Sequence, residues 1–426
     1  MKRKPFLLFA VLVVFAASLP VAAQMFVPKT IQFKGVPEYS DQELLSAAGL
    51  KKGEAVAYSD VNGDMQKLLD TGLFASCRYV YNGVDLIFTL APSPALYLVR
   101  LENLPLAPGK ELDAALHNRL PLYHGKVPFD GGLTEQVRQA LEEMLAAKGI
   151  KATVVALPRT DPKLNEVTAM GYSITTPPVR VGEIHLDGAS APLDPNAMEI
   201  LSKLTGKDYD LEGSPSQIET YLGNYYHDKG YLEAAIHATA QTTPVIAPEA
   251  IHIPFQVSVA PGALYKLKGI QLAPDIPITQ AEFDHQSRID PGDTATSQDL
   301  IEDWQFIEQR YHNKGYMRAV VRPTPSFDRA QATVSFTVTA EPGPVYTMGK
   351  LTIENTADDL RAAMLAAWKM PAGAVFNQAA AIGFYATHDV NPALERTIAS
   401  NKFIFSTRLN DETHTVDVAL RLEKKH

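Results

Sequence analysis

The chain has 426 residues, of which 46% are apolar and 20% are charged, and this globular composition argues against disorder and against a collagen-like repeat. Its formal net charge of −9 argues against a nucleic-acid-binding protein. The single cysteine, Cys77, excludes an intramolecular disulfide and a metal site built from several cysteines. At roughly 150 residues per domain, the length alone suggests about three domains.

The first 23 residues are predicted to be an export signal. Three basic residues at 2–4 precede an uninterrupted run of apolar and small residues at 6–19, and Pro20 is followed by small residues that end at Ala23. This order is typical of a secretory signal that is cleaved. An uncleaved N-terminal membrane anchor fits the same residues, and this alternative stays open.

The rest of the chain repeats itself. The sequence YHDKGY at 226–231 recurs as YHNKGY at 311–316. Equivalent positions hold Gly72, Gly149, Gly230, Gly315 and Asn401, which are 77, 81, 85 and 86 residues apart. A second set of glycines, at 53, 125, 206, 292 and 373, follows nearly the same spacing. The two markers together predict five units of about 80 residues in place of three domains.

Each unit is predicted to follow the order β-α-α-β-β. In the first unit, Ser40 and Glu43 form a capping box that opens the first helix. In the fourth unit, Leu300, Ile307 and Tyr311 recur at helical spacing and define the second helix. Two strands are expected after every second helix.

The recurrence of glycine at the helix ends has a conformational reason. A left-handed residue is needed where the second helix ends and the chain turns into a strand, and glycine adopts it without strain. Gly72, Gly149, Gly230 and Gly315 are therefore predicted helix stops. Asn401 takes the same role in the fifth unit, because asparagine is the next best residue in this conformation.

Prolines mark the joints between units, as in Ala340–Pro344. Because proline fixes φ and extends the preceding residue, we expect stiff joints. The predicted boundaries are 1–23 for the export signal and 24–92, 93–177, 178–261, 262–343 and 344–426 for the five units.

This unit resembles the polypeptide-transport-associated (POTRA) domain. The resemblance is carried by the Lys-Gly-Tyr helix ends of the third and fourth units and by the junction Glu341–Tyr346. It is weakest in the fifth unit, where Asp389–Pro392 interrupts the second helix. Tandem POTRA domains behind a signal are similar to the periplasmic arm of BamA-like outer-membrane barrel-assembly proteins. The resemblance implies an α+β fold: three-stranded mixed sheets packed on two helices each, in an elongated array.

In that family the array is followed by a membrane β-barrel, whose sixteen strands of roughly 10 residues would need about 160 residues. Only Lys425 and His426 follow the last predicted strand. We therefore expect a non-enzymatic protein that keeps the role of the arm without the barrel. The resemblance implies an exported protein, in the periplasm or at the periplasmic face of the outer membrane of a Gram-negative-type bacterium. Its partners would be envelope proteins, including unfolded outer-membrane proteins or their assembly machinery, and any membrane association would be peripheral or through a partner.

The expected binding mode is strand addition, in which an extended peptide pairs with an exposed sheet edge. The strand after the second helix is the predicted edge. The candidate partner-binding residues lie in the third and fourth units and are Leu232, Ala234, Ile236, Met317, Ala319 and Val321. The alternative is that these edges are capped and inert.

No catalytic group, cofactor or metal is predicted. His227 and His312 occupy equivalent positions of neighbouring repeats, so they are expected to lie far apart, and Cys77 is expected to be a buried apolar residue. No Walker loop, dinucleotide motif or nucleophile elbow is present. Two further alternatives stay open: a POTRA scaffold with a retained N-terminal anchor, and an exported enzyme with an unrecognised α+β fold.

Overall fold

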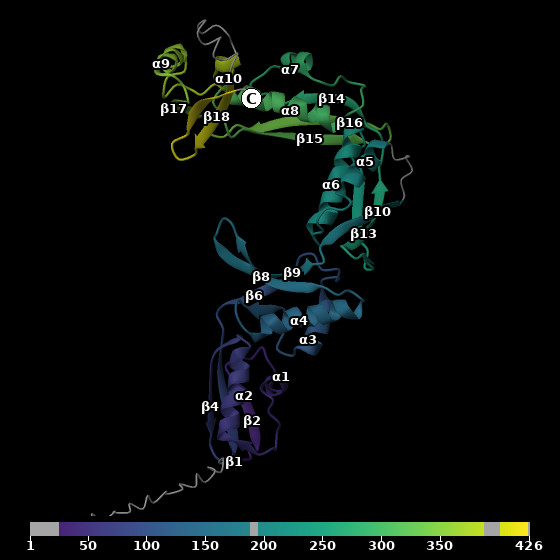
Figure 1. The fold of residues 1–426 in the computed structure, drawn as a ribbon. Helices are drawn as coiled ribbons and strands as arrows, with labels where there is room; N and C mark the ends of the chain where they lie inside the picture. Colours follow the sequence, from purple (N-terminus) through teal and green to yellow (C-terminus); the bar gives the residue numbers. More distant parts are fainter. Residues whose placement is uncertain (1–24, 188–194, 387–400, 425–426) are drawn as a thin grey trace, which may run out of the picture. The chain divides into compact units, whose positions relative to one another are not determined.

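The computed structural model describes residues 25–187, 195–386 and 401–424 (Figure 1). The predicted export signal lies outside the described residues. Among the described helices, none has the length and apolar character needed to cross a membrane.

The chain divides into two compact bodies. The first contains the described residues up to 184 together with 204–215 and 240–255, and the second contains the other described residues. Repeats of the same α+β unit make up both bodies.

The first two units lie in the first body. In unit one the elements are β1 (Met25–Phe26), β2 (Thr30–Lys34), α1 (Asp41–Ala48), β3 (Val56–Ala57), α2 (Tyr58–Asp70), β4 (Phe74–Tyr81) and β5 (Asp85–Pro92). In unit two they are β6 (Leu96–Leu101), α3 (Lys110–Arg119), β7 (Lys126–Pro128), α4 (Gly132–Ala147), β8 (Thr153–Asp161) and β9 (Glu166–Thr176). The predicted capping box of α1 is present, with both reciprocal bonds between Ser40 and Glu43.

The remaining units follow the same order. Unit three comprises β10 (Val179–Asp187), α5 (Pro195–Leu204), α6 (Gly213–Asp228), β11 (Ala235–Ala240), β12 (Val245–Ile246) and β13 (Ile251–Ala260). Unit four comprises β14 (Lys266–Leu272), α7 (Gln280–Gln286), α8 (Ser297–His312), β15 (Val320–Asp328) and β16 (Thr333–Glu341). Unit five comprises β17 (Thr347–Glu354), α9 (Asp358–Ala367), α10 (Gln378–Ala386), β18 (Asn401–Asn410) and β19 (Thr415–Lys424).

In every unit the last strand lies inside the sheet, between the first strand and the strand after the second helix. The sheet orders are β2-β5-β4, β7-β6-β9-β8, β10-β13-β11, β14-β16-β15 and β17-β19-β18. In units one, two, four and five the first strand runs parallel to the central strand, because the helices provide the crossover, and the hairpin partner runs antiparallel. The predicted α+β fold of five tandem POTRA-like units is confirmed. Two sheets differ in having a fourth strand: β7 pairs with β6, and β12 pairs with β13.

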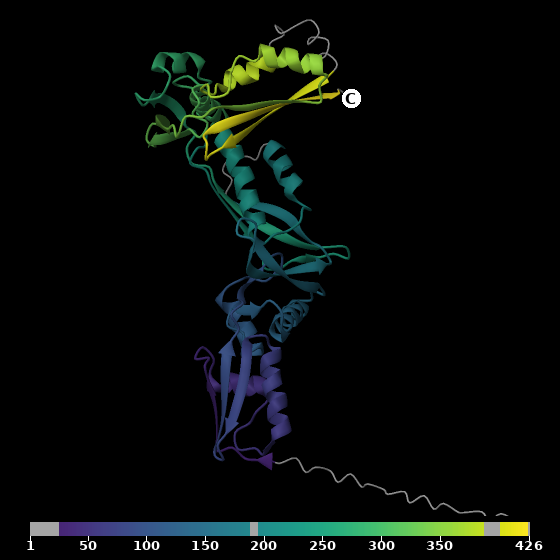
Figure 2. The same cartoon turned by 90° about the vertical axis from the view of Figure 1, so that its left-hand side faces the viewer.

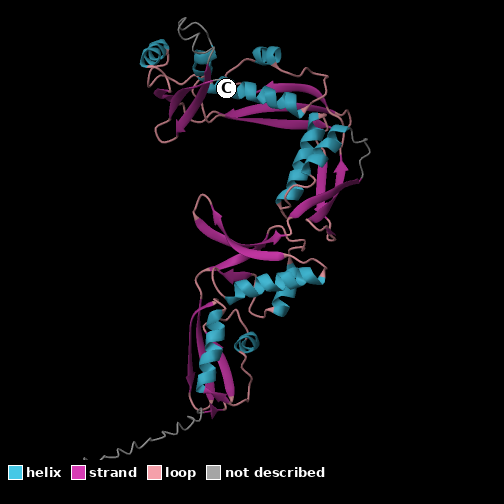
Figure 3. Cartoon of the chain, viewed as in Figure 1, coloured by secondary structure: helices cyan, strands magenta, loops and turns pink. Residues whose placement is uncertain are grey.

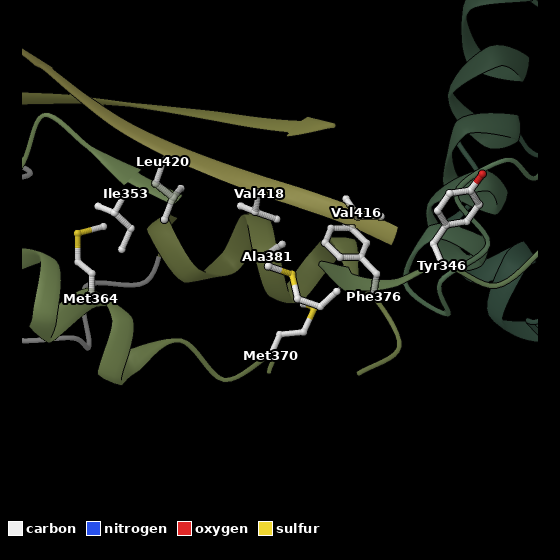
Figure 4. Packing of buried hydrophobic residues seen from close by; sticks show 10 residues of the cluster. Tyr346, Ile353, Met364, Met370, Phe376, Ala381, Val416, Val418 and Leu420 are labelled. Carbon is white, nitrogen blue, oxygen red and sulfur yellow. The ribbon is translucent and has the colours of Figure 1, made fainter. Parts of the chain in front are cut away.

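The core of each unit lies between its sheet and its helices. Figure 2 shows the helical layer of unit five on one side of its yellow strands, and Figure 3 shows α8 running along the sheet of unit four. In unit five, Val416, Val418 and Leu420 are every second residue of β19, and they face Met364 and Ala381 of the helices (Figure 4). The period of two places one face of β19 against the helices.

The four predicted helix-end glycines adopt the left-handed conformation, whereas Asn401 lies in a strand. Gly72, Gly149, Gly230 and Gly315 follow their helices with φ of 77°, 80°, 90° and 86°, which is the left-handed conformation. Asn401 differs from the prediction, since it is the first residue of β18 and pairs with Lys424. Its backbone therefore continues a strand ladder and does not end a helix. The segment before it, 387–400, lies outside the described residues.

Candidate functional site

The strand after the second helix lies at a sheet edge in every unit: β4, β8, β11, β15 and β18 each end a sheet order. Such a strand has backbone groups on its outer side that an extended peptide can pair with. The availability of these groups therefore decides which units can bind a partner by strand addition.

Four of the six predicted binding residues lie before the edge strands and not within them. Leu232 and Met317 sit in a turn before the strand, and Ala234 and Ala319 immediately precede β11 and β15. The amides of Ala234 and Ala319 each close this turn, on the carbonyls of Tyr231 and Tyr316 at 3.0 and 3.1 Å. Of the six predicted residues, only Ile236 and Val321 lie within a strand.

The side chains of several of these residues face inward. Leu232 packs against the core of unit four, and Met317 packs against the core of unit five, so both contribute to a joint with the next unit. Ala319 and Val321 pack against the core of their own unit. A partner on these edges would therefore meet backbone groups, and it would meet the side chains of the intervening residues.

The outward backbone groups of β11 can be identified from a side-chain contact. The Ala238 amide donates a hydrogen bond to Oε1 of Glu219, on helix α6, at 2.9 Å. Because in-plane directions alternate along a strand, the amides of Ile236 and Ala240 point to the same side. His237 Nδ1 lies 3.3 Å from the same carboxylate oxygen. Glu219 thus occupies one of the outward donors of β11.

A similar contact is present in unit two. The Val154 amide at the start of β8 donates to Glu142 Oε1, on helix α4, at 2.9 Å, and Glu142 is also paired with Arg138 at 2.6 Å. A glutamate of the second helix therefore holds an edge amide in two units. The sequence offers no distinct signal for this contact, because a glutamate on the exposed part of a helix is common.

Prolines remove outward donors from β15. Pro323 and Pro325 lie in β15, 85 residues after Ala238 and Ala240 in the repeat. Thr339 Oγ1 donates to the carbonyl of Arg322, 3.4 Å away and directly opposite on β16. The backbone groups of Arg322 thus face β16, and those of the two prolines face outward. Since proline has no N–H, the outer side of β15 lacks two donors that β11 has.

The joints of the second body are built on the helix-end glycines. The Tyr265 amide donates to the Gly230 carbonyl at 3.0 Å, and the Tyr346 amide donates to the Gly315 carbonyl at 2.7 Å. A Cβ atom on Gly315 would lie 2.8 Å from Val375 Cγ1 and 2.9 Å from the Tyr346 carbonyl oxygen. These glycines therefore allow close approach of the next unit as well as a left-handed turn.

A polar cluster closes each of these two joints. Between units three and four, the Glu233 carboxylate accepts from Tyr265 Oη and from Arg329, whose Nη2 lies 2.5 Å away. Between units four and five, the Asp411 carboxylate accepts from Tyr346 Oη at 2.5 Å and from Arg318 Nη2 at 2.8 Å.

The two clusters carry opposite charges at equivalent positions. Glu233 and Arg318 both lie three residues after the helix-end glycine, whereas Arg329 and Asp411 both belong to the last hairpin of the next unit. The hydrogen bond from Arg329 lowers the pKa of the Glu233 carboxyl, and the hydrogen bond from Arg318 lowers the pKa of the Asp411 carboxyl. The sequence did not predict these clusters, because their members lie 96 and 93 residues apart.

Cys77 lies in β4, whereas His227 and His312 lie near the ends of α6 and α8. Cys77 is buried, and burial raises the pKa of its thiol to about 11, so the reactive thiolate is scarce at neutral pH. His227 and His312 do not belong to the one group of potential metal ligands found among the described residues, which is Glu43, His117 and His124.

Comparisons with known proteins match one unit to a known domain family. Residues 265–343 match the family model of the POTRA domain, described as a surface antigen variable number repeat. The outer membrane protein assembly factor BamA of Buchnera aphidicola subsp. Acyrthosiphon pisum is 22% identical over 234 residues, which are 52% of this chain and 37% of that protein. The match thus spans little more than a third of the curated relative. The chain carries a POTRA domain and resembles the periplasmic arm of BamA, as the sequence predicts.

Solved structures of POTRA domains also match. POTRA domains 3–5 of BamA from Haemophilus influenzae are 17% identical and cover 58% of this chain and 96% of their own, with a TM-score of 0.41. POTRA domains 1–3 of Omp85 from Anabaena are 17% identical and cover 58% of this chain and 96% of their own, with a TM-score of 0.24.

Proposed function

We propose that this chain is a non-enzymatic protein of the bacterial envelope whose POTRA units bind extended segments of outer-membrane proteins by strand addition. The periplasm, or the periplasmic face of the outer membrane, is the proposed location. The proposed role is in the assembly or transport of outer-membrane proteins. The match of residues 265–343 to the POTRA family and the BamA relative support this role.

One observation carries the choice of binding edge: β11 has outward amides where β15 has prolines. Ala238 and Ala240 of β11 correspond to Pro323 and Pro325 of β15. We therefore place strand addition at β11, where Ile236 is the predicted residue within the strand. The residues predicted in unit four, Met317, Ala319 and Val321, adjoin an edge with fewer donors, so they are the weaker candidates.

Glu219 would act as a displaceable occupant of this edge. Its carboxylate holds the Ala238 amide at 2.9 Å, and its side chain is about one-third exposed (34%), so an incoming strand can replace it and water can solvate the released carboxylate. A hydrogen bond to a charged group contributes about 1.5–3 kcal/mol, and a carbonyl of the incoming strand would offset part of this loss by accepting from the same amide. The glutamate also reduces pairing with another copy of this chain when no partner is present.

Site-specific photo-crosslinking in living cells tests the proposal. Crosslinkers at the exposed positions Ala235, His237 and Thr239 of β11 are expected to form adducts with outer-membrane proteins. The matched control uses the equivalent exposed positions of β15, which are Val320, Arg322 and Thr324, and fewer adducts are expected there.

The A240P variant separates backbone pairing from side-chain contact. Proline removes the outward amide of residue 240, and the fold of the repeat accommodates this residue, because Pro325 occupies the equivalent position. We expect A240P to abolish the adducts and the control Thr239→Ala to retain them. Equal adducts from β11 and β15, or adducts that persist in A240P, would exclude strand addition at β11.

A further inference from the structure

We propose a binding site for a divalent transition-metal ion, represented by Zn²⁺, at the joint between units one and two. The ligands are Glu43 of helix α1, His117 of helix α3 and His124 of the loop that follows α3. Their ligand atoms all lie within 4.8 Å of one another. All three residues belong to the first body of the protein.

The distances fit a single tetrahedral ion. Glu43 Oε1 lies 3.0 Å from His124 Nε2 and 3.5 Å from His117 Nε2. Bond lengths of about 2.0–2.2 Å from zinc to nitrogen and oxygen place neighbouring ligands of a tetrahedron about 3.4 Å apart. Two histidines and one carboxylate are a ligand set that zinc and other first-row metals use, with the remaining position taken by water.

The tautomer of His117 is set by a backbone contact. His117 Nδ1 lies 3.0 Å from the carbonyl oxygen of Tyr123, which can only accept a hydrogen bond, so Nδ1 carries the proton. In the neutral ring, the Nε2 lone pair then faces a carboxylate oxygen. His117 Nε2 and Glu43 Oε1 are both electron-rich and lie 3.5 Å apart, so they repel one another. A cation bound to both atoms would remove this repulsion. A carbonyl behind a histidine is also the usual outer-shell arrangement of metal-binding histidines.

The carboxylate of Glu43 is held in place by its other oxygen. Oε2 accepts from the Ser40 amide at 2.6 Å and from Ser40 Oγ at 2.7 Å, which leaves Oε1 directed at the two histidines. The Tyr39 ring lies 4.9 Å from the ring of His124. The side chains of His117 and His124 are 43% and 36% exposed, so an ion can enter from solvent.

Metal binding would link two units. Glu43 belongs to unit one, and both histidines belong to unit two, 74 and 81 residues later in the chain. Among the residues that the structure describes, this joint has no cluster of tyrosine, carboxylate and arginine like those at the joints after units three and four. A bound ion would therefore restrict this joint in place of such a cluster, and its effect would depend on the metal concentration.

The test uses the full mature chain without a polyhistidine tag. Zinc binding is measured by calorimetry, and Co²⁺ in place of zinc reports the ligand geometry by its visible absorption. We expect one saturable zinc site and cobalt bands of a four-coordinate nitrogen and oxygen set. Each of H117A and H124A is expected to weaken binding by at least about ten-fold, the loss produced even by outer-shell substitutions.

Two controls keep the outcome interpretable. His285→Ala, in unit four, removes a histidine outside the cluster and is expected to leave zinc affinity unchanged. Hydrogen exchange at the Tyr123 amide, which donates to Leu120 at 2.8 Å, is expected to slow when zinc binds to the wild type and to stay unchanged in H117A. If the wild type shows no zinc binding, or the H117A/H124A double variant binds zinc as tightly as wild type, the three residues form only a hydrogen-bonded cluster and the proposal is wrong.

Discussion

Replacing Gly315 by alanine separates the two roles of the helix-end glycine. At φ +86°, a non-glycine residue costs about 1–2 kcal/mol. The added Cβ would also lie 2.9 Å from the Tyr346 carbonyl oxygen, a backbone atom that cannot turn away. Overpacking of this kind costs typically about 1–3 kcal/mol, so we expect a total loss of about 2–5 kcal/mol at this joint.

Gly149→Ala is the matched control. Its φ is +80°, and a Cβ atom there meets nothing within 4 Å, so only the conformational cost of about 1–2 kcal/mol applies. Both substitutions lower the entropy of the unfolded chain equally, so this gain cancels in the comparison. The difference of about 1–3 kcal/mol measures the close approach of unit five.

Native-state hydrogen exchange measures these effects locally, which matters because a chain of several units does not unfold in two states. The Tyr316 and Ile150 amides report the two helix ends, since they donate to Tyr311 and Leu145 at 3.1 and 3.0 Å. The Tyr346 amide, bonded to Gly315, reports the joint. We expect G315A to speed exchange at both Tyr316 and Tyr346. If G315A and G149A cost the same at their helix ends and Tyr346 is unaffected, Gly315 serves only as a helix stop.

Three further predictions concern charges and edges. Glu233→Arg and Arg329→Glu are each expected to loosen the joint between units three and four, because each places like charges together. The double variant is expected to restore the joint. Hydrogen exchange at the Tyr265 amide, measured in a double-mutant cycle, tests this. Asp303 is buried, and burial raises the pKa of its carboxyl, so the stability of unit four should fall as pH rises from about 3.9, the unfolded value, to the folded pKa. Asp303→Asn should remove this slope in denaturation curves at several pH values, whereas Asp303→Ala should cost about 1–3 kcal/mol at neutral pH, because the Arg288 amide loses its acceptor at 2.8 Å. Glu219→Ala frees the Ala238 amide and is expected to increase crosslinking at β11; an unchanged or lower yield would contradict the role of Glu219 as an edge occupant.

Local patterns predicted the fold well because they act over a few residues. The Ser40–Glu43 capping box and the helical spacing of Leu300, Ile307 and Tyr311 depend on contacts within one or two turns, and all three apolar residues are buried. The prediction that Asn401 ends a helix was wrong. The preference of asparagine for the left-handed conformation is weaker than the strand pairing that Asn401 joins in β18. β7 was missed because three residues are too few for an alternating pattern.

The candidate sites required knowledge of directions and distant contacts. The prolines of β15 were visible in the sequence, yet their meaning depends on which backbone groups point outward, and only the strand register decides that. Likewise, Glu43 and His124 are separated by 81 residues and meet only because α1 and the loop after α3 lie together at one joint.

The two polar joints indicate which part of the repeat fixes the geometry. Their charges are reversed between the upstream residue and the downstream hairpin, while the backbone bond from the tyrosine amide to the helix-end glycine is kept. In both joints the tyrosine hydroxyl donates to whichever side carries the carboxylate, Glu233 before it or Asp411 after it. A phenol can donate to a carboxylate in either position because its O–H rotates, and it needs no fixed charge of its own. The backbone bond between tyrosine and glycine is thus the contact that the two joints share, and the acidic and basic residues exchange places around it.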